Sequence, residues 1–224
     1  MTILQVAAVV VVVVVALVAA ANQKQVRDQR SIDLFDLGKS LGFDEFCPNR
    51  DSGFVMGWGF LSPLSHGDDR YALNILRGIY QGQTLFIFDH HYRIGNGKEE
   101  SHIYGTMLML VEKQAFPQLL IHHNSGQDRL EAVFGIGNEV KLESAEFSRA
   151  FSVRSQDKKF AFDVCNPQMM EFLLQNPDMR LEINGPIISL AFEPLLPVDR
   201  IELNLQRLAQ IRSLMPDFLF TQNA

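Results

Sequence analysis

The pattern of hydrophobic and polar positions begins with one long apolar run. From Ile3 to Ala21 the chain has nineteen residues, of which only Gln5 is polar. A helix of that length spans about 28 Å at 1.5 Å per residue, which is close to the hydrocarbon thickness of a bilayer. The pattern therefore predicts a transmembrane anchor over residues 3–21.

The charges beside this run predict its orientation. No Lys or Arg precedes the run, whereas Lys24, Arg27 and Arg30 follow it directly. Because positively charged flanks stay on the cytoplasmic side, we expect a single-pass inner-membrane protein whose C-terminal domain is cytoplasmic. The alternative is a cleaved secretory signal, since Ala19 and Ala21 form a pattern that signal peptidase accepts. Cleavage there would give an exported envelope protein.

Residues 22–45 have a weaker hydrophobic pattern. Apolar residues recur near helical spacing among charged ones, at Val26, Leu34, Leu37 and Leu41. This spacing is typical of an amphipathic helix, and Gly42 is a suitable end for it. We therefore expect a juxtamembrane helix or linker over residues 22–45, followed by a single globular domain over residues 46–215.

The first half of this domain has the pattern of β-strands. A short strand is expected around residues 54–60. Three apolar and aromatic runs follow, "YALNILRGIY", "TLFIFDHHYRI" and "HIYGTMLMLVE", and "PQLLIHHN" is a plausible fourth. The Gln81-Gly82 pair and the glycine-rich "GNGKEE" suit tight turns between the runs. Consecutive strands joined by turns predict an antiparallel meander with at least one buried face.

The second half mixes helical and strand patterns. "DRLEAVFG" and "SAEFSRAF" have short helical spacing, whereas "FSVRS" and "KKFAFDV" are typical of paired strands. Asn166 and Pro167 suit the first positions of a helix. "MRLEINGPIISLAFE" predicts two strands around an Asn184-Gly185 turn.

The chain closes with an amphipathic pattern. One apolar stripe runs along Ile201, Leu205, Leu208, Ile211 and Met215. Such a stripe packs on a sheet. The whole pattern predicts an α+β protein, in which an N-terminal transmembrane helix precedes an antiparallel β-rich domain with a C-terminal amphipathic helix.

Composition and charge narrow the function classes. The chain has 224 residues, including seventeen Phe, which is enough for one ordinary domain with a real core. The formal net charge of −6, with acidic residues between the basic ones, argues against nucleic-acid binding. Cys47 and Cys165 lack redox or metal-ligand spacing and fit a compartment that keeps thiols reduced. We expect Cys165 to be buried on a strand.

The candidate chemistry lies in "FDHHYRIGNGKEESH", residues 88–102. Successive side chains of a strand point to opposite faces, so each adjacent pair of histidines can supply one metal ligand at most. The turn brings residue 91 towards residue 102, so His91, His102 and His122, with Asp89 nearby, could form a metal site across strands. A metal-dependent hydrolase is therefore one alternative, although histidines on a half-exposed strand are more often structural.

Other catalytic signatures are missing from the sequence. "GNGK" lacks the remaining residues of a phosphate-binding loop, and no G-x-S-x-G elbow occurs. Asp89 and Asp163 stand in apolar runs, where a buried carboxylate needs a partner, so we expect a structural ion pair at each. These observations favour a non-enzymatic protein and predict no cofactor.

Two segments of the chain resemble a family of bacterial single-pass membrane-anchored proteins of unknown function. The family pattern is close to N-x-x-x-G-x-Y-x-G-x-x-x-x-x-F-D-Y-x-Y, followed by a charged turn, E-F-x-x-x-F-x-V and a helix after Pro. The matching positions here are Asn74, Gly78, Tyr80, Gly82, Phe88, Asp89 and Tyr92, while His90 stands where Tyr is usual. The resemblance covers residues 32–215 and implies no activity.

The sequence thus predicts a membrane-tethered, non-enzymatic domain that binds a protein or lipid partner at the cytoplasmic face of the inner membrane. Residues 3–21 would make the membrane contact. The metal-dependent hydrolase and the exported envelope protein are the alternatives.

Overall fold

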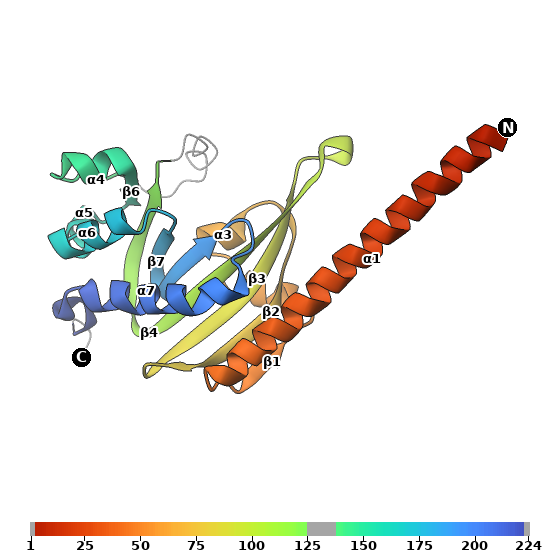
Figure 1. The fold of residues 1–224 in the computed structure, drawn as a ribbon. Coiled ribbons are helices and arrows are strands. Elements are labelled where there is room, and N and C mark those ends of the chain that lie inside the picture. The colour runs from red at the N-terminus through yellow and green to blue at the C-terminus, as the bar shows by residue number, and fades with distance from the viewer. Residues whose placement is uncertain (1–2, 125–137, 222–224) are drawn as a thin grey trace.

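The computed structural model describes residues 3–124 and 138–221. A curved antiparallel sheet forms the centre of the domain, and one long helix projects from it (Figure 1). This helix, α1, runs without a break from Ile3 to Ser40 and is about 57 Å long at 1.5 Å per residue. Gly42 follows it with a φ of 73°, so the predicted helix end near Gly42 is confirmed.

α1 contains the residues of the predicted membrane anchor. Of the side chains between residues 3 and 21, the structure describes those of Val14, Val18 and Ala21. Within the part of the chain that the structure describes, no helix is long and apolar enough to cross a membrane. The anchor stays a prediction from the sequence.

Among the described residues, seven strands form one sheet in the order β1-β2-β3-β4-β6-β5, and β7 pairs with β4. The strands are β1 (Glu45–Cys47), β2 (Asp68–Tyr80), β3 (Gln83–Ile94), β4 (Ser101–His123), β5 (Asn138–Glu139), β6 (Phe151–Ser155) and β7 (Arg180–Phe192). β4 connects the parts of the sheet. It pairs with β3 along its first half, with β6 at its end and with β7 along much of its length. The predicted antiparallel meander, with positive φ at both Gln81 and Gly82, is confirmed.

Two predicted breaks do not occur. Separate strands were expected for residues 102–112 and 117–124, but β4 runs through both. A turn was expected at Asn184-Gly185, but β7 continues through it with Gly185 at a φ of 55°. Gly185 faces Phe116 where the register of the β4–β7 pair shifts, so two long neighbouring strands absorb both irregularities as a bulge.

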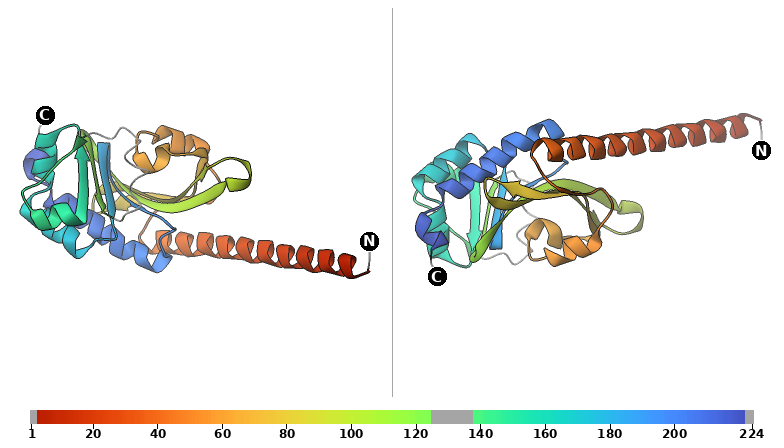
Figure 2. Two further views of the ribbon diagram at one scale, coloured as in Figure 1. Left: turned by 90° about the horizontal axis from the view of Figure 1, so that it is seen from above. Right: turned by 90° about the horizontal axis from the view of Figure 1, so that it is seen from below.

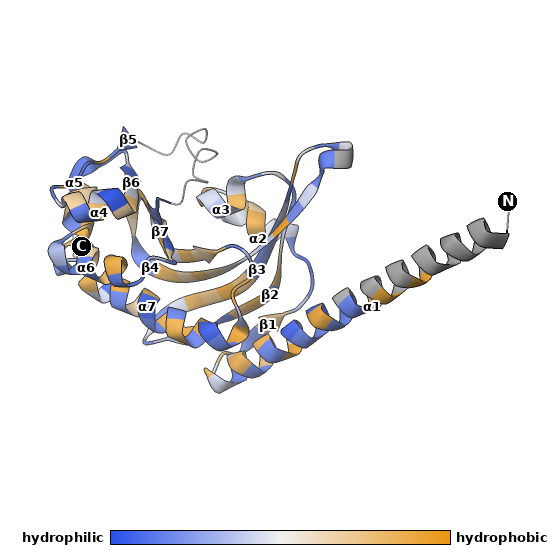
Figure 3. Cartoon of the chain, turned by 45° about the horizontal axis from the view of Figure 1, so that its top comes forward, coloured by the Kyte–Doolittle hydropathy of each residue, from blue (hydrophilic) through white to orange (hydrophobic). Residues whose placement is uncertain are grey.

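Helices cover both faces of the sheet (Figure 2). On one face, α2 (Ser52–Gly57) and α3 (Ser62–Ser65) close the smaller core. On the other face, the main core lies under α1, α4 (Ala145–Ala150), α5 (Lys158–Val164), α6 (Pro167–Gln175) and α7 (Ile201–Leu214). Short 3₁₀ helices are η1 (Gly97–Glu99), η3 (Val198–Arg200) and η4 (Asp217–Phe220). Figure 3 shows apolar residues on the strands of the sheet and also on the helices that cover it.

The segment "KKFAFDV" is helix α5 and not the predicted strand. The Asp157 carboxylate accepts a hydrogen bond from the Phe160 amide at 3.0 Å and thereby starts the helix. Phe160 and Val164, four residues apart, are both buried, so the apolar residues follow helical spacing. Asp163 therefore pairs with Lys159 on the helix surface, at 2.8 Å, and is not a buried acid on a strand.

The remaining elements divide between confirmed and corrected predictions. The strand expected around residues 54–60 is instead α2 with the turn after it, because Asp51 caps the helix. Cys165 is buried as expected, but it ends α5 and does not lie on a strand. The Asn166 cap, the helix at "SAEFSRAF", the strand at "FSVRS" and the closing amphipathic helix are confirmed. "DRLEAVFG" lies outside the described residues. The α+β class with an antiparallel sheet is confirmed.

Candidate functional site

A buried polar cluster fixes α1 to the sheet. Arg30 of α1 donates hydrogen bonds to both carboxylate oxygens of Asp89 on β3, at 2.8 and 2.7 Å. The same carboxylate accepts from the Thr106 hydroxyl at 2.9 Å and from the Asn74 side-chain amide at 3.0 Å. We call these four residues the junction network. Asp89 is 1 % exposed, so the ion pair predicted for it is confirmed as a buried one.

The junction network also holds the segment after β7. Arg30 donates to the Leu196 carbonyl at 2.9 Å, and the Thr106 hydroxyl accepts from the Leu196 amide at 3.1 Å. Three segments that are far apart in the sequence therefore meet at the Asp89 carboxylate. Charge-assisted bonds of this kind offset the cost of keeping a carboxylate charged away from water.

The sequence predicts only part of this network. Arg30 is one of the charges that predict the orientation of the anchor, and an ion pair is predicted for Asp89 without a named partner. No local pattern links the two, because they are 59 residues apart. The signal that could have joined part of the network is the family pattern, which contains both Asn74 and Asp89. Asn74 has a φ of 53°, a left-handed conformation that Asn adopts more readily than most residues.

A chain of hydrogen bonds joins His91 and His102, two of the candidate metal ligands. His91 Nδ1 lies 2.9 Å from the Asp69 carbonyl oxygen, and His91 Nε2 lies 2.9 Å from His102 Nδ1. His102 Nε2 lies 3.2 Å from the Glu100 carboxylate. Because a carbonyl only accepts, His91 donates through Nδ1 and accepts at Nε2. His102 Nδ1 therefore faces the accepting nitrogen of His91, and His102 Nε2 faces the Glu100 carboxylate.

Aromatic rings enclose His91. The Tyr71 ring stacks on the imidazole with centroids 4.4 Å apart, and the Tyr104 ring lies 4.7 Å from it. Burial lowers the pKa of His91, which agrees with its neutral role in the chain. Burial and the hydrogen bond with Tyr104 raise the pKa of the Tyr71 hydroxyl, so the phenol stays neutral. Arg50 lies over the Tyr71 ring, 4.2 Å from the ring centroid.

The four candidate metal ligands do not all lie together. His91 and His102 lie together. His122 lies opposite Ser152 of β6, near the far end of β4, and Asp89 forms an ion pair with Arg30. Among the described residues, no three His, Cys, Asp or Glu side chains are grouped so that they could hold a metal ion. The geometry therefore gives the metal-dependent hydrolase no ligand set.

His90 lies on the opposite face of β3 from His91 and is also buried, against the expectation of a half-exposed strand. Neither of its ring nitrogens has a hydrogen-bond partner among the described residues. Burial is the main cause that lowers the pKa of His90 to about 4. Gly105 faces the ring, and a side chain at this position would collide with His90 Nε2.

A second buried carboxylate, which sequence reasoning misses, belongs to Glu182 on β7. It accepts hydrogen bonds from the Ser62 amide at 2.9 Å and the Ser62 hydroxyl at 2.6 Å, at the start of α3. Burial raises the pKa of Glu182, although these hydrogen bonds act in the other direction. The contact ties α3 to the sheet.

A groove of about 440 Å³ lies next to the junction network. Its lining comes from β4 and from the segment after β7: His102, Ile103, Tyr104, Glu193, Pro194 and Leu195. We call it the junction groove. Leu195 is adjacent to Leu196, whose backbone bonds to the junction network, so the groove and the attachment of α1 form one region.

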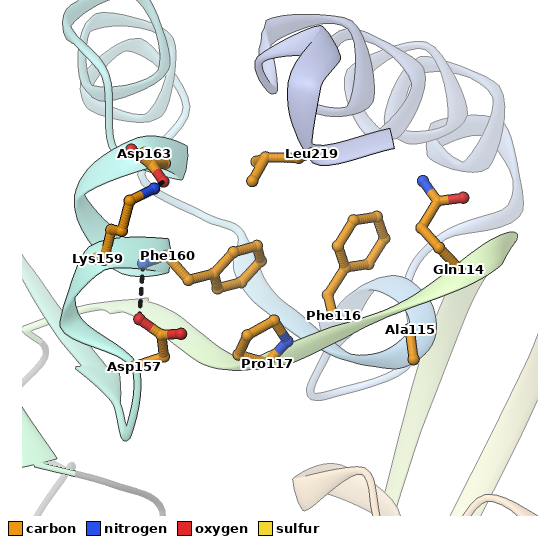
Figure 4. Close-up of a pocket in the computed structure, with 9 residues that line it drawn as sticks. All are labelled: Gln114, Ala115, Phe116, Pro117, Asp157, Lys159, Phe160, Asp163 and Leu219. Carbon is orange, nitrogen blue, oxygen red and sulfur yellow. Dashed lines mark hydrogen bonds and ion pairs between the residues drawn. The ribbon is translucent and has the colours of Figure 1, made fainter. Parts of the chain in front are cut away.

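A pocket of about 210 Å³ lies where β4, α5 and the C-terminal segment meet (Figure 4). Phe116, Phe160 and Leu219 contribute its apolar surface. Its charged groups already serve the fold, since Asp157 caps α5 and Lys159 pairs with a neighbouring carboxylate. The pocket is therefore a gap in the packing of β4, α5 and the C-terminal segment.

Figure 2 shows α2 on the face of the sheet away from α1. An aromatic surface covers α2 and the adjacent part of the sheet. The rings of Phe54, Trp58, Phe60 and Phe86 contact one another with centroids 5.6 to 6.4 Å apart. Met56 beside them is 69 % exposed. Exposed apolar groups gathered in one patch are typical of interaction surfaces.

Comparisons with known proteins identify the fold and no family. No protein-family model and no curated protein matches the chain. The chain is similar to the crystal structure of the mycobacterial trehalose monomycolate transport factor A, TtfA, with a TM-score of 0.61. The match covers 83 % of this chain and 96 % of that chain at 15 % sequence identity, so it shows a shared fold alone.

Proposed function

We propose that this chain is a membrane-tethered, non-enzymatic domain that binds a lipid or protein partner at the cytoplasmic face of the inner membrane. The observation that carries the proposal is the junction network, which joins the helix of the predicted anchor to the centre of the sheet. Simple attachment would need only a flexible linker. A continuous helix held by a buried ion pair would instead give the domain a defined height and orientation.

The spacing along α1 agrees with this arrangement. Eight residues lie between Ala21 and Arg30, and the nine helical steps correspond to about 13 Å of helix. Lys24 and Arg27 lie within this spacer, where positive charges favour a cytoplasmic headgroup region. The domain would therefore be held close beneath the bilayer.

The likeness to TtfA supports an envelope-related role. That protein is by name a trehalose monomycolate transport factor. We infer for this chain a comparable part in transport or envelope assembly, in which it positions a partner and performs no reaction. The aromatic surface offers a place for a protein partner, and the junction groove offers a place for a lipid.

The test is the behaviour of the full-length chain in bacterial membranes. We expect the chain to resist alkaline carbonate extraction, to keep its N-terminal residues, and to be digested by protease only in inside-out vesicles. Replacing Val11 and Val12 with Arg should release it, because each charge in the bilayer core costs several kcal/mol. Arg at Val26 and Ile32, which lie outside residues 3–21, is the matched control and should leave the chain in the membrane.

Two outcomes would contradict the proposal. Extraction of the unaltered chain by carbonate would remove the tether. A mature N-terminus at Asn22, with protease access from outside the cell, would support the exported envelope protein instead.

A further inference from the structure

The junction groove lies on the side of the domain that would face the bilayer. In Figures 1 and 2 the β3–β4 hairpin and α1 leave the domain in the same direction. From the Arg30–Asp89 contact, α1 rises nine residues to Ala21, about 13 Å, and β3 rises five residues to Ile94, about 16 Å. The hairpin tip would therefore reach the membrane surface, with the groove just beneath it.

The lining of the junction groove is amphipathic. Ile103, Pro194 and Leu195 give it apolar walls, while Tyr104 contributes an aromatic ring with a hydroxyl group. Glu193 brings a carboxylate to the same lining. A ligand that fits would have both an apolar part and hydrogen-bonding groups.

The charges around the groove disfavour a phosphate. His102 lies 3.2 Å from the Glu100 carboxylate, and Arg93 lies 3.5 Å from the same group, so both of these side chains already face an anion. Glu193 adds a second carboxylate, which accepts from the Tyr92 hydroxyl at 3.2 Å. An anionic headgroup would be repelled by the Glu100 and Glu193 carboxylates. Hydroxyl groups are better suited, because they donate to carboxylates.

We propose that the junction groove binds the uncharged, hydroxyl-rich headgroup of a membrane glycolipid, with the start of its acyl chain against Ile103 and Leu195. Glu193 and Tyr104 bond to the headgroup hydroxyls, and the His91–His102 chain holds the rim in shape. This assignment rests on the proposed function, because the tether brings the groove to the headgroup layer.

The experiment uses the full-length chain in phosphatidylcholine nanodiscs that contain a photoactivatable acylated disaccharide. Photoactivatable phosphatidylglycerol in separate nanodiscs is the anionic comparison. After irradiation, we expect the disaccharide lipid to label peptides that contain residues 101–104 and 193–195, and phosphatidylglycerol to label them far less. The free disaccharide in solution should compete, which identifies the headgroup as the part that is recognised.

Matched variants test whether the groove is the site. Leu195→Trp fills the groove, whereas Leu203→Trp places the same ring on the exposed face of α7. Glu193→Gln removes the acceptor charge, and Glu146→Gln on α4 is its control. We expect each groove variant to lower labelling about tenfold, which corresponds to about 1.4 kcal/mol, and each control to leave it unchanged. Circular dichroism of all variants checks the fold.

Three results would overturn the glycolipid assignment. Equal or stronger labelling by phosphatidylglycerol would show that the headgroup class is wrong. If Leu195→Trp lowers the labelling but the free disaccharide does not compete, the groove recognises only the acyl chain. Labelling that is unchanged in both groove variants would show that the lipid binds elsewhere.

Failure of the tether is distinguished by a separate measurement. Carbonate extraction of the same chain reports the tether alone. If the chain is released, the same labelling and variants in detergent micelles with the acylated disaccharide still test the groove, because no bilayer is then required. Absence of labelling there would reject the groove independently of the tether.

Discussion

The buried imidazole of His90, which has no hydrogen-bond partner among the described residues, predicts an acid-sensitive fold. Its pKa is lowered from 6.5 to about 4 by burial, so the unfolded chain takes up a proton at a higher pH than the folded chain does. Stability that depends on neutral His90 is therefore complete above pH 6.5 and is lost as the pH falls towards 4. The perturbation that removes this dependence is His90→Phe, which keeps an aromatic ring without a titrating group.

The magnitude follows from the size of the pKa change. One pKa unit corresponds to about 1.4 kcal/mol, so the change at His90 corresponds to about 3 kcal/mol between pH 6.5 and 4. That is a large share of the roughly 5–15 kcal/mol by which domains are stable. Glu182 acts in the opposite direction, because its raised pKa favours the folded state as the carboxyl becomes protonated. The difference between His90→Phe and the unaltered chain cancels this contribution.

The assay is urea unfolding of the full-length chain in a neutral detergent, followed by circular dichroism at several pH values from 7.5 to 4.5. At pH 7.5 we expect His90→Phe to be as stable as the unaltered chain or more stable, since two unsatisfied nitrogens have been removed. At pH 4.5 it should be more stable by about 2 kcal/mol or more. Leu203→Phe, at an exposed position of α7 that does not titrate, is the control and should keep the original pH dependence. An unchanged slope in His90→Phe would refute the reasoning.

Two further changes test the attachment of α1 and the start of α5. Arg30→Gln should lower the free energy of unfolding by about 3–5 kcal/mol, because it leaves the Asp89 carboxylate buried without its cation. Lys24→Gln, on the exposed part of the same helix, should have almost no effect in the same urea titration, and a small loss in Arg30→Gln would show that water reaches the carboxylate. Asp157→Ala should cost about 1 kcal/mol through loss of the helix cap, read from the urea midpoint, whereas Asp157→Asn should retain most of the stability.

Local patterns predict the meander well because its information is local. Two glycine-containing turns join strands that are neighbours in both sequence and space, so turn chemistry and strand alternation indicate the same structure. The same reasoning fails at Asn184-Gly185, where a turn dipeptide lies inside β7. There the decisive partner is β4, which lies alongside β7 on both sides of the dipeptide. A long-range pairing that overrides a local turn signal is invisible to a short window.

The error at α5 has a different origin. In "KKFAFDV" the apolar positions satisfy both the two-residue period of a strand and the spacing of one helical turn. The cap at Asp157 decides the matter, because it satisfies an amide that a strand would pair elsewhere. In "SQDKKF", Asp157 is a suitable N-cap residue, and this signal favours the helix.

In the candidate site too, local patterns predict the contacts within a hairpin and miss the contacts between distant segments. His91 and His102 are brought together by a hairpin, and counting residues on each side of the turn predicts that they lie close together. His122 cannot join them, because β4 is one uninterrupted strand that carries it away from the hairpin. The link from Arg30 to Asp89 depends on how a helix lies across the sheet, which no local pattern encodes.

The junction network explains why a buried ion pair is useful at this point. Replacing such a pair with apolar residues often leaves a protein equally stable, so its value is better sought in the geometry that it specifies. An apolar contact would let α1 slide or rotate by one turn, at little cost, against the sheet. The two oxygens of Asp89, Thr106 and the Leu196 carbonyl instead accept Arg30 in one register only. If α1 continues into the bilayer as proposed, that register also determines which side of the domain faces the membrane, and the junction groove lies on that side.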